Sequence, residues 1–113
     1  MATRTLPKSE WQSYCDRISK TLEGKQAQVE IVGLALGDQK LAAKGVPLLG
    51  ITYDPKDDLV EIALEGLDHL ISRPREVAVN EGAEGLESME IVDADQARQI
   101  VKLSQPLMLP PPA

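Results

Sequence analysis

The sequence predicts an α+β domain that is mainly β, with one N-terminal amphipathic helix packed on a small antiparallel sheet. Near the N-terminus, apolar residues recur at steps of three and four, which is the helical period. From residue 28 onward, short runs rich in Val and Ile are separated by Gly, Pro and Asp, as in strands joined by turns. The helix must bury its apolar stripe against another layer. We therefore expect either a strongly bent sheet or a small SH3-like or Sm-like barrel beneath it.

The helix is expected over residues 9–23. Ser9 with Gln12 three residues later has the pattern of a capping box, and Gly24 suits the left-handed position after a last turn. Polar residues occupy the other side of this segment. The apolar stripe consists of Trp11, Tyr14, Cys15, Ile18 and Leu22.

The middle of the chain is expected to contain a strand, a loop and a hairpin. The strand covers residues 28–34, and the polar stretch from Gly37 to Gly45 is expected to be a loop. A hairpin follows over residues 48–65, because Pro55 presets the dihedral of a type I turn and Asp54 can accept a backbone hydrogen bond two residues on. In its second arm, apolar and polar residues alternate, which predicts one buried face.

A bent strand is expected next. Residues 68–73 begin an extended segment that Pro74 interrupts before Val79. Because proline cannot donate to a ladder, Pro74 must lie at an edge, a bulge or a corner between two sheet halves. The elements that follow are a loop at 81–85, a strand at 86–92 and a turn at 93–96.

Residues 96–104 fit two structures. Asp93 with Gln96 could cap a helix, whereas Ile100 to Leu103 could pair as a strand. We favour the strand, because a short segment after a turn suits a hairpin.

The length of 113 residues, of which 42% are hydrophobic and 27% charged, predicts one domain. We place this globular domain at residues 9–104. Residues 1–8 are expected to be a flexible N-terminus. Residues 105–113 contain four prolines in nine residues, which predicts a Pro-rich disordered tail.

Charge and composition exclude several partners. Twelve Lys and Arg against eighteen Asp and Glu give a net charge of −6, which repels phosphate backbones, and one Trp, two Tyr and no Phe leave little to stack on bases. We expect no nucleic acid partner. The longest apolar stretch, at residues 46–51, is far shorter than the roughly 20 residues of a membrane helix, so no membrane association is expected. A single cysteine, Cys15, cannot form an internal disulfide, which favours the cytoplasm.

The chain has one histidine, His69, so acid–base chemistry at neutral pH depends on it. Together with Asp68, Tyr53 and Arg73 it forms a weak candidate catalytic group. A lone histidine flanked by Leu and Ile is more often a strand residue bonded to the backbone. We therefore assign no catalytic residue.

Asp54, Asp57 and Asp58 supply three carboxylates on one turn, a weak candidate site for a hard cation. The cluster lacks the spacing of an EF-hand, and aspartate in turns is explained by bonding to the backbone. One Cys and one His cannot make a structural zinc site, and no Gly-rich phosphate loop is present. No metal or cofactor is expected.

Two motifs resemble a small bacterial family catalogued only as a domain of unknown function. They are Leu-Gly-Ile-x-Tyr-Asp at 49–54 and His-Leu-Ile-x-x-Pro at 69–74. The resemblance covers the chain from Trp11 to Leu103. It implies no activity, cofactor or catalytic residue, and it draws attention to His69 and Tyr53.

These observations favour a non-enzymatic binding or assembly module that pairs through a sheet edge, with a protein partner or with itself as a homodimer. We place that edge at the strand of residues 28–34, with Val32 and Leu34 as its contacts. Two alternatives stay open. One is a small-ligand-binding or metal-dependent enzyme centred on His69, and the other is an Sm-like RNA-binding ring.

Overall fold

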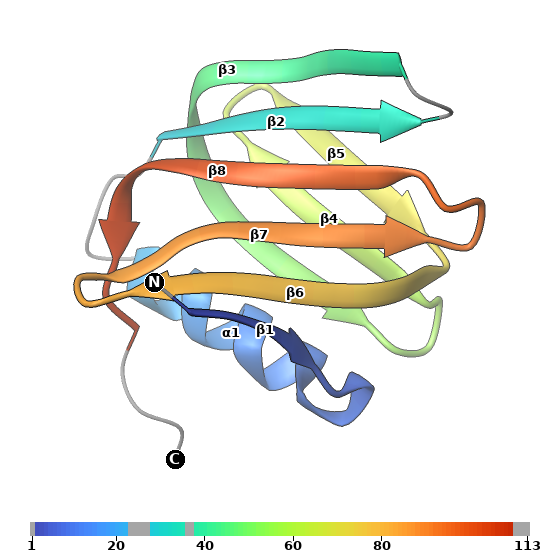
Figure 1. Ribbon diagram of the computed structural model, residues 1–113, viewed down its shortest axis with the longest axis horizontal. Coiled ribbons are helices and arrows are strands. Elements are labelled where there is room, and N and C mark those ends of the chain that lie inside the picture. The colour runs from blue at the N-terminus through green and yellow to red at the C-terminus, as the bar shows by residue number, and fades with distance from the viewer. Residues whose placement is uncertain (1, 23–27, 36–37, 110–113) are drawn as a thin grey trace.

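A computed structural model describes residues 2–22, 28–35 and 38–109, with side chains described for residues 3–22, 45–66 and 68–109 (Figure 1). Apart from one short 3-10 turn, the described elements are one helix and eight strands. In chain order they are β1 (Ala2–Leu6), the 3-10 turn η1 (Lys8–Glu10), α1 (Trp11–Leu22), β2 (Gln28–Ala35), β3 (Asp38–Asp54), β4 (Leu59–Leu64), β5 (Leu67–Ser72), β6 (Pro74–Gly82), β7 (Gly85–Asp93) and β8 (Arg98–Leu107).

All strand pairings are antiparallel and follow the order β1-β6-β7-β8-β2-β3-β4-β5. The long strand β3 belongs to two sheets, because residues 38–47 pair with β2 and residues 48–54 pair with β4. We call β1-β6-β7-β8-β2 with the first part of β3 the large sheet, and the last part of β3 with β4 and β5 the small sheet. The small sheet and α1 lie on the same side of the large sheet (Figure 1). The expected mainly β fold is confirmed in its bent-sheet form, since the two sheets do not close into a barrel.

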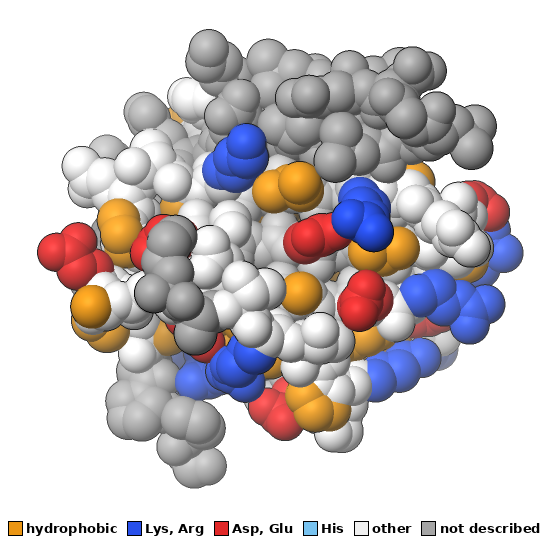
Figure 2. Space-filling view, in the orientation of Figure 1, with side chains coloured by type: hydrophobic (Ala, Val, Ile, Leu, Met, Phe, Trp, Pro, Cys, Tyr) orange, Lys and Arg blue, Asp and Glu red, His pale blue; other side chains and the backbone are white. Residues whose placement is uncertain are grey.

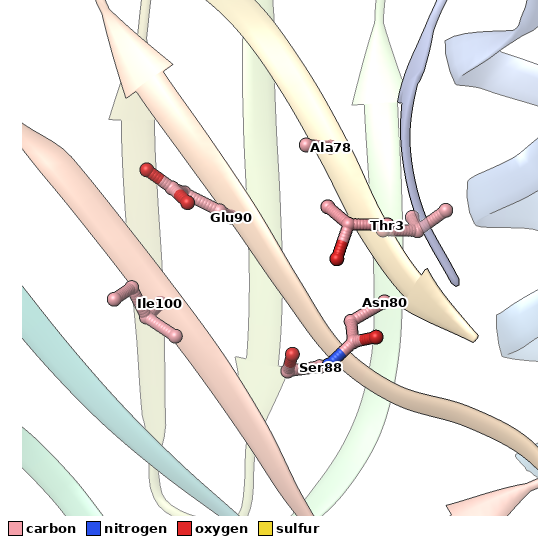
Figure 3. Close-up of a pocket in the computed structure, with 7 residues that line it drawn as sticks. Thr3, Ala78, Asn80, Ser88, Glu90 and Ile100 are labelled. Atoms are coloured by element: carbon pink, nitrogen blue, oxygen red, sulfur yellow. The ribbon is translucent and has the colours of Figure 1, made fainter. Parts of the chain in front are cut away.

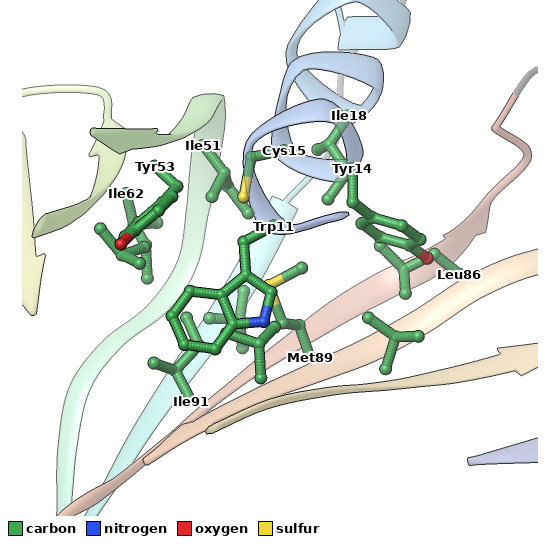
Figure 4. Close-up of a cluster of buried hydrophobic side chains, with 14 of the residues drawn as sticks. Trp11, Tyr14, Cys15, Ile18, Ile51, Tyr53, Ile62, Leu86, Met89 and Ile91 are labelled. Carbon is green, nitrogen blue, oxygen red and sulfur yellow. The ribbon is translucent and has the colours of Figure 1, made fainter. Parts of the chain in front are cut away.

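The core lies between these three layers. Four residues of the expected stripe on α1 (Trp11, Tyr14, Cys15 and Ile18) point toward apolar side chains of β3, β4 and β7 (Figure 4). The rings of Trp11 and Tyr53 pack edge to face, with their centroids 5.2 Å apart. Along β4 the burial alternates as the sequence predicts, with Val60, Ile62 and Leu64 inside.

The helix closes the gap left by the bend of β3. After the bend, β3 no longer pairs with β2, and the backbone N–H and C=O of Ile51 point toward α1. Ser19 Oγ accepts from the Ile51 N–H at 2.9 Å and donates to the Ile51 carbonyl at 2.7 Å. A hydroxyl can do both at once. Gly50 allows this approach, since a Cβ there would lie 3.2 Å from Ser19 Oγ.

Several local expectations are corrected. The stretch from 38 to 45 is part of β3 and not a loop, because its backbone pairs with β2 despite its polar composition. The strand at 28–34 is not an edge, since β2 lies between β8 and β3. The helix begins at Trp11 after η1, whose N-cap is Pro7 without a side-chain hydrogen bond, so Ser9 does not form the expected cap. Gly24 lies outside the described residues.

Both ends of the expected domain also extend further. Residues 2–6, placed in a flexible N-terminus, form β1 against β6, and the Leu6 carbonyl accepts a hydrogen bond from Trp11 Nε1 at 3.0 Å. The expected tail begins as strand, because β8 continues to Leu107, which is buried. Leu6 in the first segment and Leu107 in the second are buried, so both segments contribute to the hydrophobic core. The composition of these segments did not predict this.

Other expectations are confirmed. The hairpin of β3 and β4 has Asp54 Oδ1 accepting from the Lys56 N–H at 2.9 Å, and residues 98–107 form a strand. The segment around Pro74 makes a corner: Arg73 has a φ of 53°, so β5 ends in the small sheet and β6 begins in the large one. This corner divides the expected bent strand into two.

Candidate functional site

The four candidate catalytic residues lie on three different parts of the small sheet: Tyr53 on β3, Asp68 and His69 on β5, and Arg73 at the corner after β5. No hydrogen bond or ion pair joins any two of His69, Asp68, Tyr53 and Arg73 among the described residues. Asp68 and His69 are neighbours on β5 and therefore face opposite sides of the small sheet. A histidine activated by the adjacent aspartate is excluded by this alternation.

Three of these residues, His69, Arg73 and Tyr53, have a structural partner of their own. A ring nitrogen of His69 lies 3.1 Å from Gln99 Oε1 on β8, which ties the small sheet to the large one. Arg73 is exposed at the corner, where its guanidinium lies 3.8 Å from Asp95. At that separation the pair contributes little, about 0–1 kcal/mol.

Tyr53 is buried and donates its hydroxyl proton to Asp58 Oδ1 at 2.8 Å. Burial, the hydrogen bond to Asp58 and the negative charge of that group together raise the pKa of Tyr53 to about 12. Its hydroxyl is therefore a fixed donor at neutral pH, and it orders the turn after β3.

The acidic turn is likewise explained by local bonding. Asp54 Oδ1 accepts from two backbone N–H groups, and Asp58 accepts from Tyr53. Asp57 is exposed. Within the described part of the chain, no group of three or more His, Cys, Asp or Glu side chains is arranged to hold a metal ion.

The open edge of β5 is the feature that sequence reasoning missed. β5 ends the strand order, and among the described strands only β4 pairs with it. Its register with β4 has no bulge, and Leu70 is 55% exposed. Lys and Pro commonly protect an edge strand from pairing. The segment Leu67–Ser72 contains neither, and this is the signal in the sequence that could have indicated an open edge.

The hydrogen bonds of Ser19 to Ile51 determine which backbone groups of β5 point toward its open edge. Opposed residues of an antiparallel pair exchange both hydrogen bonds or neither. Because both backbone groups of Ile51 bond to Ser19, its partner Ile62 directs its own toward His69 of β5. Alternation then directs the N–H and C=O of residues 68, 70 and 72 away from β4, toward the open side.

The family model described as "Family of unknown function (DUF5335)" matches residues 2–112. The chain belongs to this family. An uncharacterised protein of Aquifex aeolicus (strain VF5) is 40% identical over 111 residues, which are 97% of this chain and 99% of the relative. The resemblance to a bacterial family of unknown function is thereby confirmed. No solved structure matches the chain.

The match to DUF5335 extends beyond the motifs that suggested it. It includes β1, which lies before Trp11, and the segment after Leu103. β1 and the last residues of β8, up to Leu107, are strand in the fold described above. Among the described helices of this DUF5335 protein, none is long and apolar enough to cross a membrane.

Proposed function

We propose that this protein is a non-enzymatic assembly module that forms a homodimer by pairing β5 with β5 of a second copy. The observation that carries the proposal is the outer edge of β5, with which no other described strand pairs and where Leu70 is exposed at the centre. A strand that presents unpaired N–H and C=O groups is a template for another strand. The location we propose is the cytoplasm, which suits the free and buried thiol of Cys15.

The edge is complementary to itself. In a two-fold antiparallel arrangement centred on Leu70, this residue lies opposite Leu70 of the second copy, and Asp68 lies opposite Ser72. Residues 68, 70 and 72 are the ones whose backbone groups point outward, so the same residues that face each other also form the hydrogen bonds. No two like charges are opposed in this register, although the chain carries a net charge of −6.

The other edge of the sheet is less suited to this role. β1 is only five residues long and is followed by Pro7, and its Arg4 is bound to Glu81. Short strands and proline are devices that keep an edge unpaired.

The His69-centred enzyme and the Sm-like RNA ring find less support. His69 is held by Gln99 and has no described catalytic neighbour. An Sm-like ring is built from closed barrels, whereas these two sheets stay open. The acidic balance of the chain also opposes RNA.

Light scattering over a series of protein concentrations tests the proposal. An interface of one strand pair is smaller than the roughly 1,200 Å² of a stable complex, so we expect a weak dimer whose mass rises with concentration. Leu70→Glu should stay monomeric throughout, because two carboxylates would then face each other. Leu49→Glu is the matched control, since Leu49 is 60% exposed on β3 and not on the edge strand.

A wild-type protein that is monomeric at every concentration would contradict the proposal. So would an unchanged association of the Leu70→Glu variant, provided that its thermal unfolding matches that of Leu49→Glu.

A further inference from the structure

On the outer face of the large sheet, an acidic side chain has its cation in the same chain. This face is turned away from the small sheet and α1, and Figure 2 shows hydrophobic, acidic and basic side chains intermixed on it. The carboxylate of Glu90 lies 3.4 Å from Arg98. Figure 3 shows this carboxylate directed away from Thr3 and Ser88, which line a shallow hollow. Glu90 is therefore paired within the chain and is not directed at the hollow.

The open edge of β5 carries an acceptor and a donor that differ in this respect. Asp68 and Ser72 are exposed, and within the described part of the chain neither side chain takes part in a hydrogen bond or an ion pair. Their cross-strand neighbours on β4 are Ala63 and Leu59, whose side chains cannot bond to them. A donor for Asp68, or an acceptor for Ser72, therefore has to come from solvent or from across the open edge.

These two residues are placed symmetrically about Leu70. Each lies two positions from it on β5, so the three side chains share the outer face of the small sheet, opposite to the buried Ile71. The backbone N–H and C=O of the same three residues point toward the open side. An antiparallel pair of β5 strands with its two-fold axis at Leu70 therefore places Asp68 of each copy opposite Ser72 of the other.

Other registers of two antiparallel β5 strands oppose unlike or repelling groups. A two-fold axis at His69 places the carboxylate of Asp68 opposite Leu70, and an axis at Asp68 places two carboxylates opposite each other. An axis at Ile71 places Leu70 opposite Ser72 and leaves Asp68 beyond the end of the facing strand. Of these registers, the one centred on Leu70 alone joins apolar to apolar and acceptor to donor.

The geometry of that register suits a hydrogen bond between the side chains. Opposed residues of an antiparallel pair have Cβ atoms about 4.5–5.5 Å apart, which a serine hydroxyl and an aspartate carboxylate can span. A hydrogen bond to an ionised acceptor is stronger than one between neutral groups. The two-fold axis produces this bond at both ends of the interface.

We propose that Asp68 and Ser72 determine which strand the β5 edge accepts, and that they select a second copy of this chain. The Asp68 carboxylate of each copy accepts a hydrogen bond from the Ser72 hydroxyl of the other. A strand with an acidic residue opposite Asp68 is rejected, because like charges then face each other. This inference rests on the proposed β5 dimer and adds to it the residues that make the pairing selective.

Exchange of the two side chains tests the proposal, with dissociation constants measured by light scattering and folding checked by thermal unfolding. Ser72→Asp should weaken the dimer at least about tenfold, because it opposes two carboxylates at both ends of the interface. The double variant Asp68→Ser, Ser72→Asp has the composition of the wild type and again opposes one carboxylate to one hydroxyl. Its dissociation constant should return to within about threefold of the wild-type value. Ser9→Asp is the control, since it adds the same charge at an exposed serine outside β5 and should leave association unchanged.

Cysteine cross-linking reports the register independently of affinity. Opposed residues that exchange hydrogen bonds have Cα atoms about 5.5 Å apart, a separation that suits a disulfide. The native Cys15 is buried and does not compete. A mixture of Asp68→Cys and Ser72→Cys should give a disulfide-linked dimer on mild oxidation. Neither variant alone should do so, because the two copies of each new cysteine are more than about 13 Å apart along the strands.

The outcomes separate this inference from the β5 dimer itself. A wild type that dimerises while the cysteine mixture does not cross-link would overturn the inference and leave the dimer standing. The same holds if the double variant associates as weakly as Ser72→Asp. A wild type that is monomeric at every concentration would overturn both.

Discussion

Glu81 joins three segments of the chain through one carboxylate. Its Oε1 accepts from Arg4 Nε on β1 and its Oε2 from the Tyr14 hydroxyl on α1, each at 2.8 Å. The guanidinium groups of Arg4 and Arg17 lie 5.9 and 4.9 Å from the centre of the Tyr14 ring. This cluster connects β1 and the helix to the end of β6.

The same contacts change two pKa values in opposite directions. Burial alone would raise the pKa of Glu81, but the hydrogen bonds from Arg4 and Tyr14 and the charges of Arg4 and Arg17 outweigh burial and lower it. Burial, followed by the hydrogen bond to Glu81, raises the pKa of Tyr14 well above its ordinary value. At neutral pH the pair is therefore one carboxylate and one neutral phenol.

Protonation of Glu81 should weaken the fold at acid pH. Because its folded-state pKa lies below the unfolded value near 4.5, its contribution is full above that pH and is lost as the pH falls through the lower folded-state pKa. We expect Glu81→Gln to cost about 1 kcal/mol of unfolding free energy at neutral pH, since the cluster is partly exposed. Urea unfolding at several pH values should show this difference shrinking below pH 4.5. A difference that is constant with pH would contradict the assigned role.

At the scale of elements, Gly85 determines how closely β8 approaches β7. It has a φ of +121°, and a Cβ there would meet the backbone of Leu107. The pairing of Leu86 with Leu107, which brings Leu107 into the core, needs this close approach. Gly66, in the turn between β4 and β5, also has a positive φ, of +81°. A Cβ added there would meet no other atom within 4 Å.

These two glycines make a matched pair. Gly66→Ala should cost roughly 1–2 kcal/mol of stability, because only the backbone conformation is strained. Gly85→Ala should cost at least about 1 kcal/mol more, since the new methyl also displaces the end of β8. Denaturant unfolding of the two variants measures the difference. Equal losses would show that β8 can move away without penalty.

For the whole molecule, α1 replaces the strand pairing that would otherwise close the bent sheet. Ser19 is the contact that makes this possible, because it satisfies both backbone groups of Ile51. Without its hydroxyl, two backbone groups beside the core lose their partner.

Ser19→Ala should therefore lower the unfolding free energy by about 1–3 kcal/mol. Ser13→Ala is the control: Ser13 lies on the same helix, and within the described structure its exposed hydroxyl donates to the Glu10 carbonyl alone, at 3.2 Å. The unfolding free energy of Ser13→Ala should stay within about 0.5 kcal/mol of the wild-type value. Urea unfolding followed by the fluorescence of Trp11 measures the unfolding free energy of both variants, because Trp11 is the only tryptophan and is 3% exposed. If both variants lose the same stability, the helix is held by its apolar stripe alone.

Elements with a strong local signal were predictable from the sequence. The stripe on α1, the Asp54–Pro55 turn and the corner at Pro74 depend on periodicity or on the backbone chemistry of one or two residues. The pairing of residues 2–6 with β6 and of residues 38–47 with β2 had no such signal. Their strand structure comes from hydrogen bonds to partners distant in the chain, which composition does not encode.

The sequence by itself determined a mainly β domain with one amphipathic helix, an acidic surface and no recognisable catalytic motif, because these follow from spacing and charge. Only the tertiary structure decided that β2 is internal and β5 is the open edge. It also placed His69 against Gln99, and it gave Tyr53 and Arg73 other partners, Asp58 and Asp95. Strand order depends on long-range pairing that satisfies each backbone group once, and the candidate sites follow from that order.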